Sequence, residues 1–238
     1  MKERIQKVIA SQGEYSRRQV ETLIDERKVK VNGVVLTEKG MKVDPSSDRI
    51  QIAGKAFRYR HDEETVVVLL NKPRRVMVTR SDEQDRKTIY ELLPKKFQHL
   101  KPAGRLDYNS QGALVVTNDG ELINELTHPR HNVPKTYEVK LSSHPEEKQL
   151  ERLKRGIVLD GVRTLPPQIK ILEKNQTSTV IQMILKEGKN RQIRRMCEAV
   201  GLTVKELKRV GIGKVTLKNT RSGRFRLLTP REIKGLKA

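Results

Sequence analysis

Residues 104–120 read GRLDYNSQGALVVTNDG, and this stretch guides the interpretation of the whole chain. It holds Asp107 on a turn between Gly104 and Gly112, directly before an apolar run at 113–116. A continuous apolar run bounded by turn residues predicts a strand of the protein core. The stretch therefore predicts a single carboxylate held on a turn beside a buried strand.

The patterns on either side of this turn predict an α+β domain. Apolar or alternating segments predict strands at residues 66–70, 113–117, 135–141, 179–186 and 214–217. Helical spacing and capping residues predict helices at 88–93, 120–126, 146–155 and 190–200. Strands outnumber helices and the connections are short, so we expect an α+β fold with a mostly antiparallel sheet.

The first 58 residues predict a separate small unit of two helices and a β-hairpin. An apolar stripe at 5–9 indicates the first helix, and Ser16 with Gln19 has the spacing of a capping box at the start of the second. Asn32 and Gly33 follow an alternating segment and form a strong two-residue hairpin signal. A polar stretch, residues 59–64, is the expected linker to a larger domain at 65–238.

The chain carries a large excess of positive charge. It has 50 Lys and Arg against 29 Asp and Glu, a net charge of +21, and both residues 1–63 and the remainder are basic. Such a field attracts polyanions and favours nucleic acid as the partner. Arg17 and Arg18 lie in the first turn of the predicted second helix, where the helix dipole disfavours cations. Beside free backbone N–H groups they form a candidate phosphate site, with a solvated helix end as the alternative.

The composition argues against several other classes of protein. No apolar run approaches the ~18 residues of a membrane span, and the N-terminus lacks a signal-peptide core. The single cysteine, Cys197, excludes an internal disulfide and fits a reducing cytoplasm. His128 and His131 lack further ligands nearby in the sequence, so we interpret them as a polar loop rather than a metal site. We therefore expect a cytoplasmic monomer without metal or membrane contact.

The predicted helix at 190–200 has one apolar face and a basic face. The apolar face consists of Ile193, Met196, Cys197 and Val200. Arg191 and Arg195 project from the opposite face, whereas Arg194 falls at the border of the apolar stripe. A border arginine buries its stem and presents its guanidinium to a half-buried acceptor.

Asp107 has two interpretations. Turn aspartates are common, and Asn109 and Ser110 favour that simple role. In the other interpretation Asp107 is a catalytic carboxylate, kept ionised in a basic protein with Arg105 or Arg194 as its partner. Without a second acid beside it, such a carboxylate neither holds a metal nor supports two-carboxylate hydrolysis, but it can act as a nucleophile or a base.

The N-terminal unit resembles the alpha-L type RNA-binding domain first known from a small-subunit ribosomal protein. The resemblance lies in residues 16–24, SRRQVETLI, in 29–33, VKVNG, and in the turn at Val43 and Asp44. It implies that structured RNA docks on the second helix and the hairpin. The candidate RNA-binding residues of this unit are Arg17, Arg18, Lys28, Lys30 and Asn32.

The remainder of the chain resembles the pseudouridine synthases of the ribosomal branch. The matching motifs are GRLD at 104–107, SQG at 110–112, LVVTNDG at 114–120, KTY at 135–137, EGKNRQIRRM at 187–196 and LKRV at 207–210. Ala113 and Gly211 depart from the family pattern, but neither touches the expected chemistry. The combination is closest to the B type of large-subunit rRNA enzymes, which act near the peptidyl transferase centre.

The resemblance implies an enzyme that breaks the glycosidic bond of uridine, turns the base and rejoins it through carbon, with neither cofactor nor metal. It implies that Asp107 is the catalytic aspartate, acting either as a base on the ribose or as a nucleophile at its anomeric carbon. Tyr137 would pack on the target base and help in the final proton removal, and Leu207 would line the pocket. Arg194 would pair with Asp107.

The family also assigns roles to basic residues of the larger domain. Arg105 would contact the RNA backbone or take the place of the target base, which must leave its stack to be modified. Candidate phosphate contacts that offset this cost are Lys135, Lys189, Arg191 and Arg195. The expected substrate is rRNA, and the predicted function is conversion of one uridine, in the large subunit, to pseudouridine.

Two other functions are compatible with the composition. One is a non-catalytic RNA-binding assembly factor, although the set of Asp107, Tyr137 and Arg194 argues against it, because RNA binding does not require a buried acid. The other is a metal-dependent RNase, which would need a divalent ion and would cleave the strand.

Overall fold

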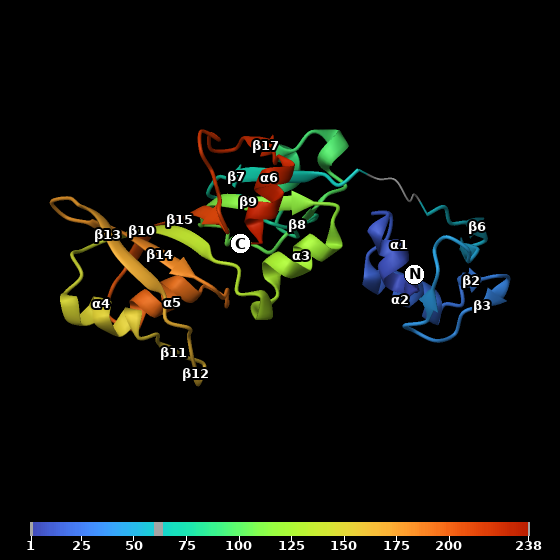
Figure 1. Ribbon diagram of the computed structural model, residues 1–238, viewed down its shortest axis with the longest axis horizontal. Coiled ribbons are helices and arrows are strands. Elements are labelled where there is room, and N and C mark those ends of the chain that lie inside the picture. The colour runs from blue at the N-terminus through green and yellow to red at the C-terminus, as the bar shows by residue number, and fades with distance from the viewer. Residues whose placement is uncertain (1, 60–63, 238) are drawn as a thin grey trace. The chain divides into compact units, whose positions relative to one another are not determined.

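The computed structural model describes residues 2–59 and 64–237. The chain forms two compact units, Met1–Thr65 and Val66–Ala238 (Figure 1). Most of the expected linker, residues 60–63, lies outside the described residues. Each unit has its own hydrophobic core.

The first unit contains the predicted helix, turn, helix and hairpin. Its helices are α1 (Ile5–Ser11) and α2 (Arg17–Asp25), and its strands are β1 (Glu3–Arg4), β2 (Val29–Val31), β3 (Val34–Val35), β4 (Lys42–Val43), β5 (Ile50–Ile52) and β6 (Lys55–Ala56). Strands β3, β2, β5 and β6 form one sheet in that order, and β1 pairs with β4. Both helices contribute to a core that includes Ile5, Ile9, Val20 and Ile24.

The capping box and the hairpin turn predicted for the first unit are both present in the structure. Ser16 accepts a hydrogen bond from the Gln19 backbone N–H at 3.2 Å, and the Gln19 side chain accepts one from Ser16 N–H at 2.7 Å. This reciprocal box fixes the start of α2. Asn32 and Gly33 both have positive φ, 52° and 86°, as a tight hairpin turn between β2 and β3 requires.

The second unit is built on one nine-stranded sheet. Its strands are β7 (Val67–Lys72), β8 (Lys101–Pro102), β9 (Gln111–Thr117), β10 (Lys135–Leu141), β13 (Gln168–Lys174), β14 (Thr179–Leu185), β15 (Val204–Ile212), β16 (Val215–Thr216) and β17 (Phe225–Leu227). The main path runs β13-β14-β10-β15-β9-β7-β17, while β16 pairs with β15 and β8 with β9. Among the described strands, β9 and β15 pair in parallel and the other pairs are antiparallel, so the predicted α+β class is confirmed.

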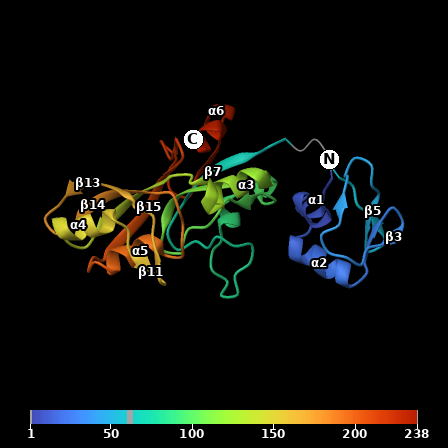
Figure 2. The same ribbon diagram turned by 60° about the horizontal axis from the view of Figure 1, so that its bottom comes forward.

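Helices and short 3₁₀ turns complete the second unit. They are η1 (Ile89–Leu92), η2 (Lys95–Phe97), α3 (Gly120–Thr127), η3 (Pro129–His131), α4 (Glu147–Lys154), α5 (Gln192–Glu198) and α6 (Pro230–Leu236). A small hairpin, β11 (Val158–Leu159) with β12 (Val162–Arg163), follows α4. Figures 1 and 2 both show α4 and α5 lying side by side, and they share a core with β10 and β14.

Strands β7 and β9 are buried on both faces. Leu69 and Val115 pack on one side in a core shared with α3 and α6. Leu70 and Leu114 pack on the other side against the η1 and η2 segments. This double burial explains the unbroken apolar runs that the sequence shows at these strands.

The sequence prediction was incomplete in the last third of the chain. It missed β15 entirely, because charged residues such as Lys208 and Arg209 interrupt the apolar positions. It also missed β13, whose residues are mostly exposed at the sheet edge, as well as β17 and α6. The helix expected at 190–200 is shorter, because Arg191 has a left-handed backbone, φ 46°, and α5 begins only at Gln192.

Candidate active site

A cleft of about 470 Å³ lies between the turn that carries Asp107, strands β10 and β15, and the segment that leads into α5. It brings together residues that are far apart in the sequence. The predicted site residues that line it are Arg105, Asp107, Lys135, Tyr137, Lys189, Arg191 and Leu207. A second cleft of about 540 Å³, lined by residues of the 77–86 loop, shares Arg105, Leu106, Asp107 and Asn190 with the first. Asp107 therefore stands where two clefts meet.

The turn that carries Asp107 is held by a buried ammonium group. Lys72, at the end of β7, is fully buried and donates to the carbonyl oxygens of Ser110 at 2.9 Å and Pro73 at 3.0 Å. The Ser110 N–H donates back to the Asp107 carbonyl at 3.0 Å, which closes the turn. Asp107 itself is half-buried. No sequence pattern indicates this role, because Lys72 only marks the end of the predicted strand.

Two lysines of the site have altered acidity. Burial lowers the pKa of Lys72 to about 8, although the nearby Asp107 carboxylate acts in the opposite direction. Burial, reinforced by the Arg209 guanidinium, also lowers the pKa of Lys135 to about 8. Both pKa values are lowered because burial removes water from the ammonium group and so disfavours its charged form.

Tyr137, Lys135 and Arg209 lie on one face of the sheet. Tyr137 on β10 is paired in register with Arg209 on β15, and Lys135 is two residues before Tyr137 on the same strand. Residues that alternate along a strand, or that are paired across it, point to the same side. All three line the cleft, together with Leu207, which is 7% exposed.

Arg194 lies in α5 beside the apolar face, as the helical pattern predicts. Ile193, Met196, Cys197 and Val200 are all buried, and burial raises the pKa of the Cys197 thiol to about 12. The Arg194 Nη1 donates to the Val204 carbonyl at 3.0 Å. Its pKa is lowered by burial and by Arg191, whereas the Asp107 charge raises it.

The expected direct ion pair between Arg194 and Asp107 is not among the salt bridges of the described residues, and the Arg194 guanidinium donates to the Val204 carbonyl. Arg194 and Asp107 therefore interact through their charges, without a direct ion pair between these two described residues.

The other basic residues near α5 differ in their surroundings. Arg195 forms a bidentate ion pair with Asp160 of the β11–β12 hairpin, at 2.9 and 2.6 Å, and does not line the cleft. Arg191 and Lys189 do line it. The sequence analysis missed Gln192, a buried side chain in this segment that donates to Glu187 at 2.5 Å and shapes the cleft wall.

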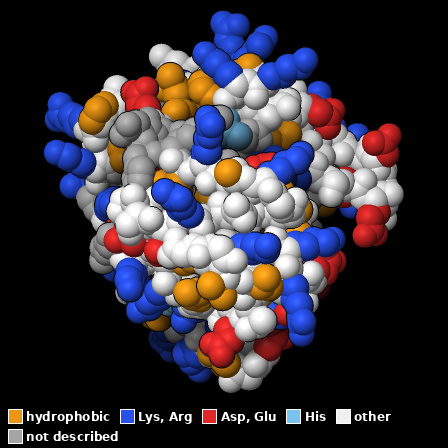
Figure 3. All heavy atoms as spheres, turned by 90° about the vertical axis from the view of Figure 1, so that its right-hand side faces the viewer, with side chains coloured by type: hydrophobic (Ala, Val, Ile, Leu, Met, Phe, Trp, Pro, Cys, Tyr) orange, Lys and Arg blue, Asp and Glu red, His pale blue; other side chains and the backbone are white. Residues whose placement is uncertain are grey.

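The candidate RNA-binding residues of the first unit are on its surface. Arg17, Arg18, Lys28 and Lys30 are exposed. Lys28 pairs with Glu26 at 2.7 Å. The Asn32 side chain donates to Asp48 at 2.9 Å and accepts from the Arg49 N–H at 2.9 Å, so it also holds the hairpin to the following turn. Figure 3 shows Lys and Arg side chains projecting at many points of one face of the molecule.

The described residues contain no group of three or more His, Cys, Asp or Glu that could hold a metal ion. In the same part of the chain, no helix is long and apolar enough to cross a membrane.

The fold matches that of a class of RNA-modifying enzymes. The RNA pseudouridylate synthase family matches residues 66–199, and the S4 domain matches residues 3–50. The chain therefore belongs to the RNA pseudouridylate synthase family and carries an N-terminal S4 domain. It is an isomerase that converts uridine in RNA to pseudouridine, which decides against a non-catalytic binding factor and against an RNase.

Particular relatives cover nearly the whole chain. Ribosomal large subunit pseudouridine synthase B of Bacillus subtilis (strain 168) is 44% identical over 238 residues, 99% of this chain and 96% of the relative. An uncharacterized RNA pseudouridine synthase of Aquifex aeolicus (strain VF5) is 37% identical, covering 98% and 93%. A crystal structure of a pseudouridylate synthase superposes with a TM-score of 0.71 at 30% identity, covering 98% and 99% of the two chains.

Proposed function

We propose that this protein converts one uridine of large-subunit rRNA, near the peptidyl transferase centre, to pseudouridine, with Asp107 as the catalytic carboxylate. The observation that carries the proposal is the cleft in which a half-buried Asp107 faces the same space as Tyr137 and Leu207. The large-subunit target is supported by the Bacillus subtilis relative, which is 44% identical across almost the full length of both chains.

The geometry supports a division of roles within the cleft. Tyr137 and Leu207 provide apolar surface on which a planar base can pack, and Asp107 approaches from the turn. Its carboxylate acts on the sugar, as a base on the ribose or as a nucleophile at the anomeric carbon. Arg194 contributes positive charge near that carboxylate. Arg105, exposed on the same turn, contacts the RNA or fills the place of the displaced base.

RNA binding is shared between the two units. In the S4 domain the exposed Arg17, Arg18, Lys28 and Lys30 contact phosphates, with Asn32 at the hairpin turn. In the larger unit Lys135, Lys189 and Arg191 line the cleft, and Arg195 lies outside it. Contacts of this kind offset the few kcal/mol needed to unstack the target base. We propose that the enzyme acts as a monomer in the cytoplasm, where the buried thiol of Cys197 stays reduced.

Tritium release tests the proposal. Large-subunit rRNA that carries tritium at carbon five of uracil loses it to water when pseudouridine forms, because that carbon joins the sugar. We expect release with the wild type and none with Asp107→Asn, which keeps the size of the side chain but not its charge. Asp85→Asn, an exposed loop carboxylate outside both clefts, is the matched control and should release at the wild-type rate.

The target needs a separate measurement. Mapping pseudouridine in rRNA from cells with and without the gene should show one lost modification in the large subunit near the peptidyl transferase centre. Loss in the small subunit would refute the target. Turnover by purified Asp107→Asn would refute the role of Asp107.

A further inference from the structure

Arg209 is a buried cation at the floor of the cleft with an unused hydrogen-bond donor. It is 6% exposed and lines the cleft that holds Asp107. Its Nε donates to the Ala113 carbonyl at 2.6 Å, but its Nη2 is buried and has no partner among the described residues. A buried donor without a partner is costly, and a charged one more so, which points to a ligand for this nitrogen.

The backbone is arranged to hold Arg209 in this position. Arg209 on β15 pairs in parallel with Gly112 on β9. Gly112 has φ 110°, and a Cβ at that position would overlap the carbonyl oxygen of Arg209. The two strands approach so closely only because residue 112 has no side chain. The guanidinium is then clamped by the Ala113 carbonyl, one residue further along β9.

The position of Arg209 relative to Tyr137 indicates which part of the substrate it meets. The two residues are paired in register across β10 and β15 and point into the same cleft. A base packed on the Tyr137 ring would have its edge over the neighbouring strand, at the level of Arg209. Exposed cations such as Arg105 and Arg191 are placed at the surface, where phosphates lie, whereas Arg209 is at the floor.

We propose that Arg209 donates a hydrogen bond through Nη2 to a carbonyl oxygen of the target uracil and stabilises the negative charge of the detached base. The inference rests on the proposed function, which places the uracil on Tyr137. When the C1′–N1 bond breaks, its electron pair passes to the ring and spreads over N1 and the carbonyl oxygens. Meanwhile C1′ is either bonded to the Asp107 carboxylate or part of the deprotonated ribose, according to which role Asp107 takes. After the base turns, the electron pair of the C5–C6 double bond forms the C1′–C5 bond and C1′ is released. The C5 proton then passes to solvent and N1 takes up a proton, so the composition of the nucleotide is unchanged. Arg209 neither gains nor loses a proton, as its always-ionised guanidinium allows.

The electrostatics of the cleft floor agree with this role. The charge of Arg209 contributes to the lowered pKa of both Lys135 and Lys72, after the larger effect of burial. Lys72 uses its ammonium on the Pro73 and Ser110 carbonyls beneath the turn. Among the described cations that line the cleft, Arg209 is therefore the one with a buried donor that has no partner. Fixed donors aimed at developing negative charge are an effective form of catalysis.

The experiment separates the chemical step from RNA binding. Arg209→Met fills much of the same volume without the charge. With enzyme in excess and RNA saturated, its rate of tritium release should fall about 100- to 1,000-fold, as on removal of one donor to a developing oxyanion. The Kd for rRNA should stay within about threefold. An unchanged saturated rate, or a loss confined to Kd, which would indicate a phosphate contact, would overturn the inference.

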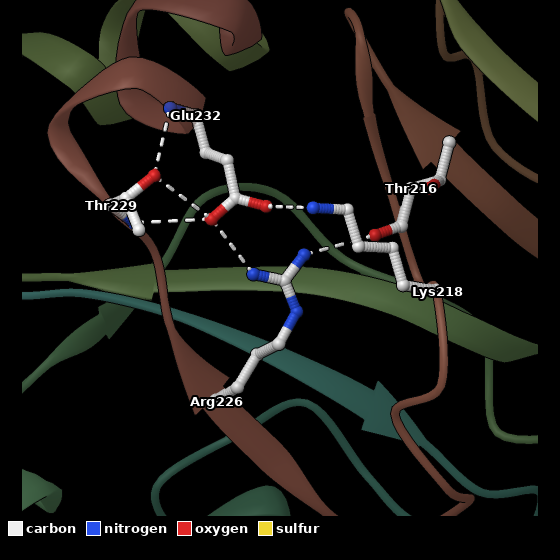
Figure 4. Close-up of polar contacts among 5 residues, drawn as sticks. All are labelled: Thr216, Lys218, Arg226, Thr229 and Glu232. Atoms are coloured by element: carbon white, nitrogen blue, oxygen red, sulfur yellow. Dashed lines mark hydrogen bonds and ion pairs between the residues drawn. The ribbon is translucent and has the colours of Figure 1, made fainter.

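A matched control is Arg226, which lies in the same sheet but outside the cleft. Its guanidinium donates to the Thr216 carbonyl at 3.2 Å and to Glu232 at 2.9 Å, and its Nε is buried without a partner (Figure 4). Arg226→Met should lower the Tm and leave the saturated rate unchanged. If Arg209→Met loses no more activity than Arg226→Met at a temperature where both are folded, Arg209 has only a structural role.

Chemical rescue distinguishes a role of Arg209 in the chemical step from a purely structural role. Arg209→Ala opens a space for a guanidinium ion. Added guanidinium should raise the rate of this variant at least tenfold, whereas urea and potassium chloride at equal concentration should not. Equal effects of all three would count against the inference. Asp107→Asn in the same assay separates the two hypotheses: activity in that variant refutes the proposed site, and an active Arg209→Met beside an inactive Asp107→Asn refutes only the role of Arg209.

Discussion

The ammonium group of Lys72 lies beneath the turn that carries Asp107 and donates to the Ser110 carbonyl at 2.9 Å. A fully buried lysine at the end of a core strand thus fixes the position of the carboxylate above it. The same ammonium also donates to the carbonyl of the next residue, Pro73, at 3.0 Å.

Replacing Lys72 by Met should loosen this turn. The buried Ser110 carbonyl and the part-buried Pro73 carbonyl lose their donor, and leaving a buried acceptor unsatisfied costs about 1–3 kcal/mol. We expect the free energy of unfolding in urea to fall by about that amount and the saturated turnover rate to fall at least tenfold. Lys205→Met, an exposed lysine on β15, is the control and should change neither. Full turnover in Lys72→Met would show that the turn does not need this support.

Gly112 should tolerate no side chain. In Gly112→Ala a Cβ would meet the Arg209 backbone, and φ 110° is unfavourable for alanine. Strain and overpacking each cost about 1–3 kcal/mol, so the free energy of unfolding should fall by about 3 kcal/mol or more. Gly120→Ala, at the start of α3 with open space around it, should be neutral or stabilising. Equal melting temperatures of the two variants would contradict the close approach of β9 and β15.

Arg194 and Arg191 should differ in which kinetic quantity their loss changes. Arg194 is partly buried and its charge interacts with that of Asp107, whereas Arg191 is exposed at the cleft. Arg194→Ala removes positive charge near the carboxylate, so the saturated turnover rate should fall while the Kd for rRNA changes little. Arg191→Ala should raise the Kd for rRNA and leave the saturated rate unchanged. The same losses of rate and affinity in both variants would refute the electrostatic link between Arg194 and Asp107.

The S4 domain should contribute affinity rather than chemistry. Arg17 and Arg18 are exposed at the start of α2. Changing both to Ala should raise the Kd for rRNA and reduce the slope of log K against log salt by roughly 1–2, as expected for one or two lost phosphate contacts. The saturated turnover rate should be retained. A fall in that rate with unchanged affinity would mean that this helix takes part in the catalytic step.

Lys135 should make stability depend on alkaline pH. Its pKa is lowered from 10.5 to about 8 in the folded protein, chiefly by burial. The unfolded chain therefore binds more protons between about pH 8 and 10.5, and this group favours folding increasingly as the pH rises through that range. The Tm of the wild type relative to Lys135→Met should thus increase from pH 7.5 to pH 10. A difference in Tm that is constant or that falls would contradict the lowered pKa.

The sequence by itself determined the local elements and the family. The capping box of Ser16 and Gln19, the Asn32–Gly33 turn and the apolar runs of β7 and β9 are short-range patterns, because neighbouring residues decide turn chemistry and strand burial. The motif around Asp107 indicated the enzyme class for a similar reason: its residues are contiguous.

Only the tertiary structure decided which cations serve the site. In the sequence Lys72 only ends an apolar run and Arg209 only belongs to the LKRV motif, yet both are buried, one beneath the Asp107 turn and the other beside Tyr137. Pairing of β15 with both β9 and β10 creates that environment, and strands separated by more than about 60 residues leave no local pattern. The Val204 carbonyl likewise took Arg194 as its partner, since hydrogen bonding depends on which groups the fold brings within reach.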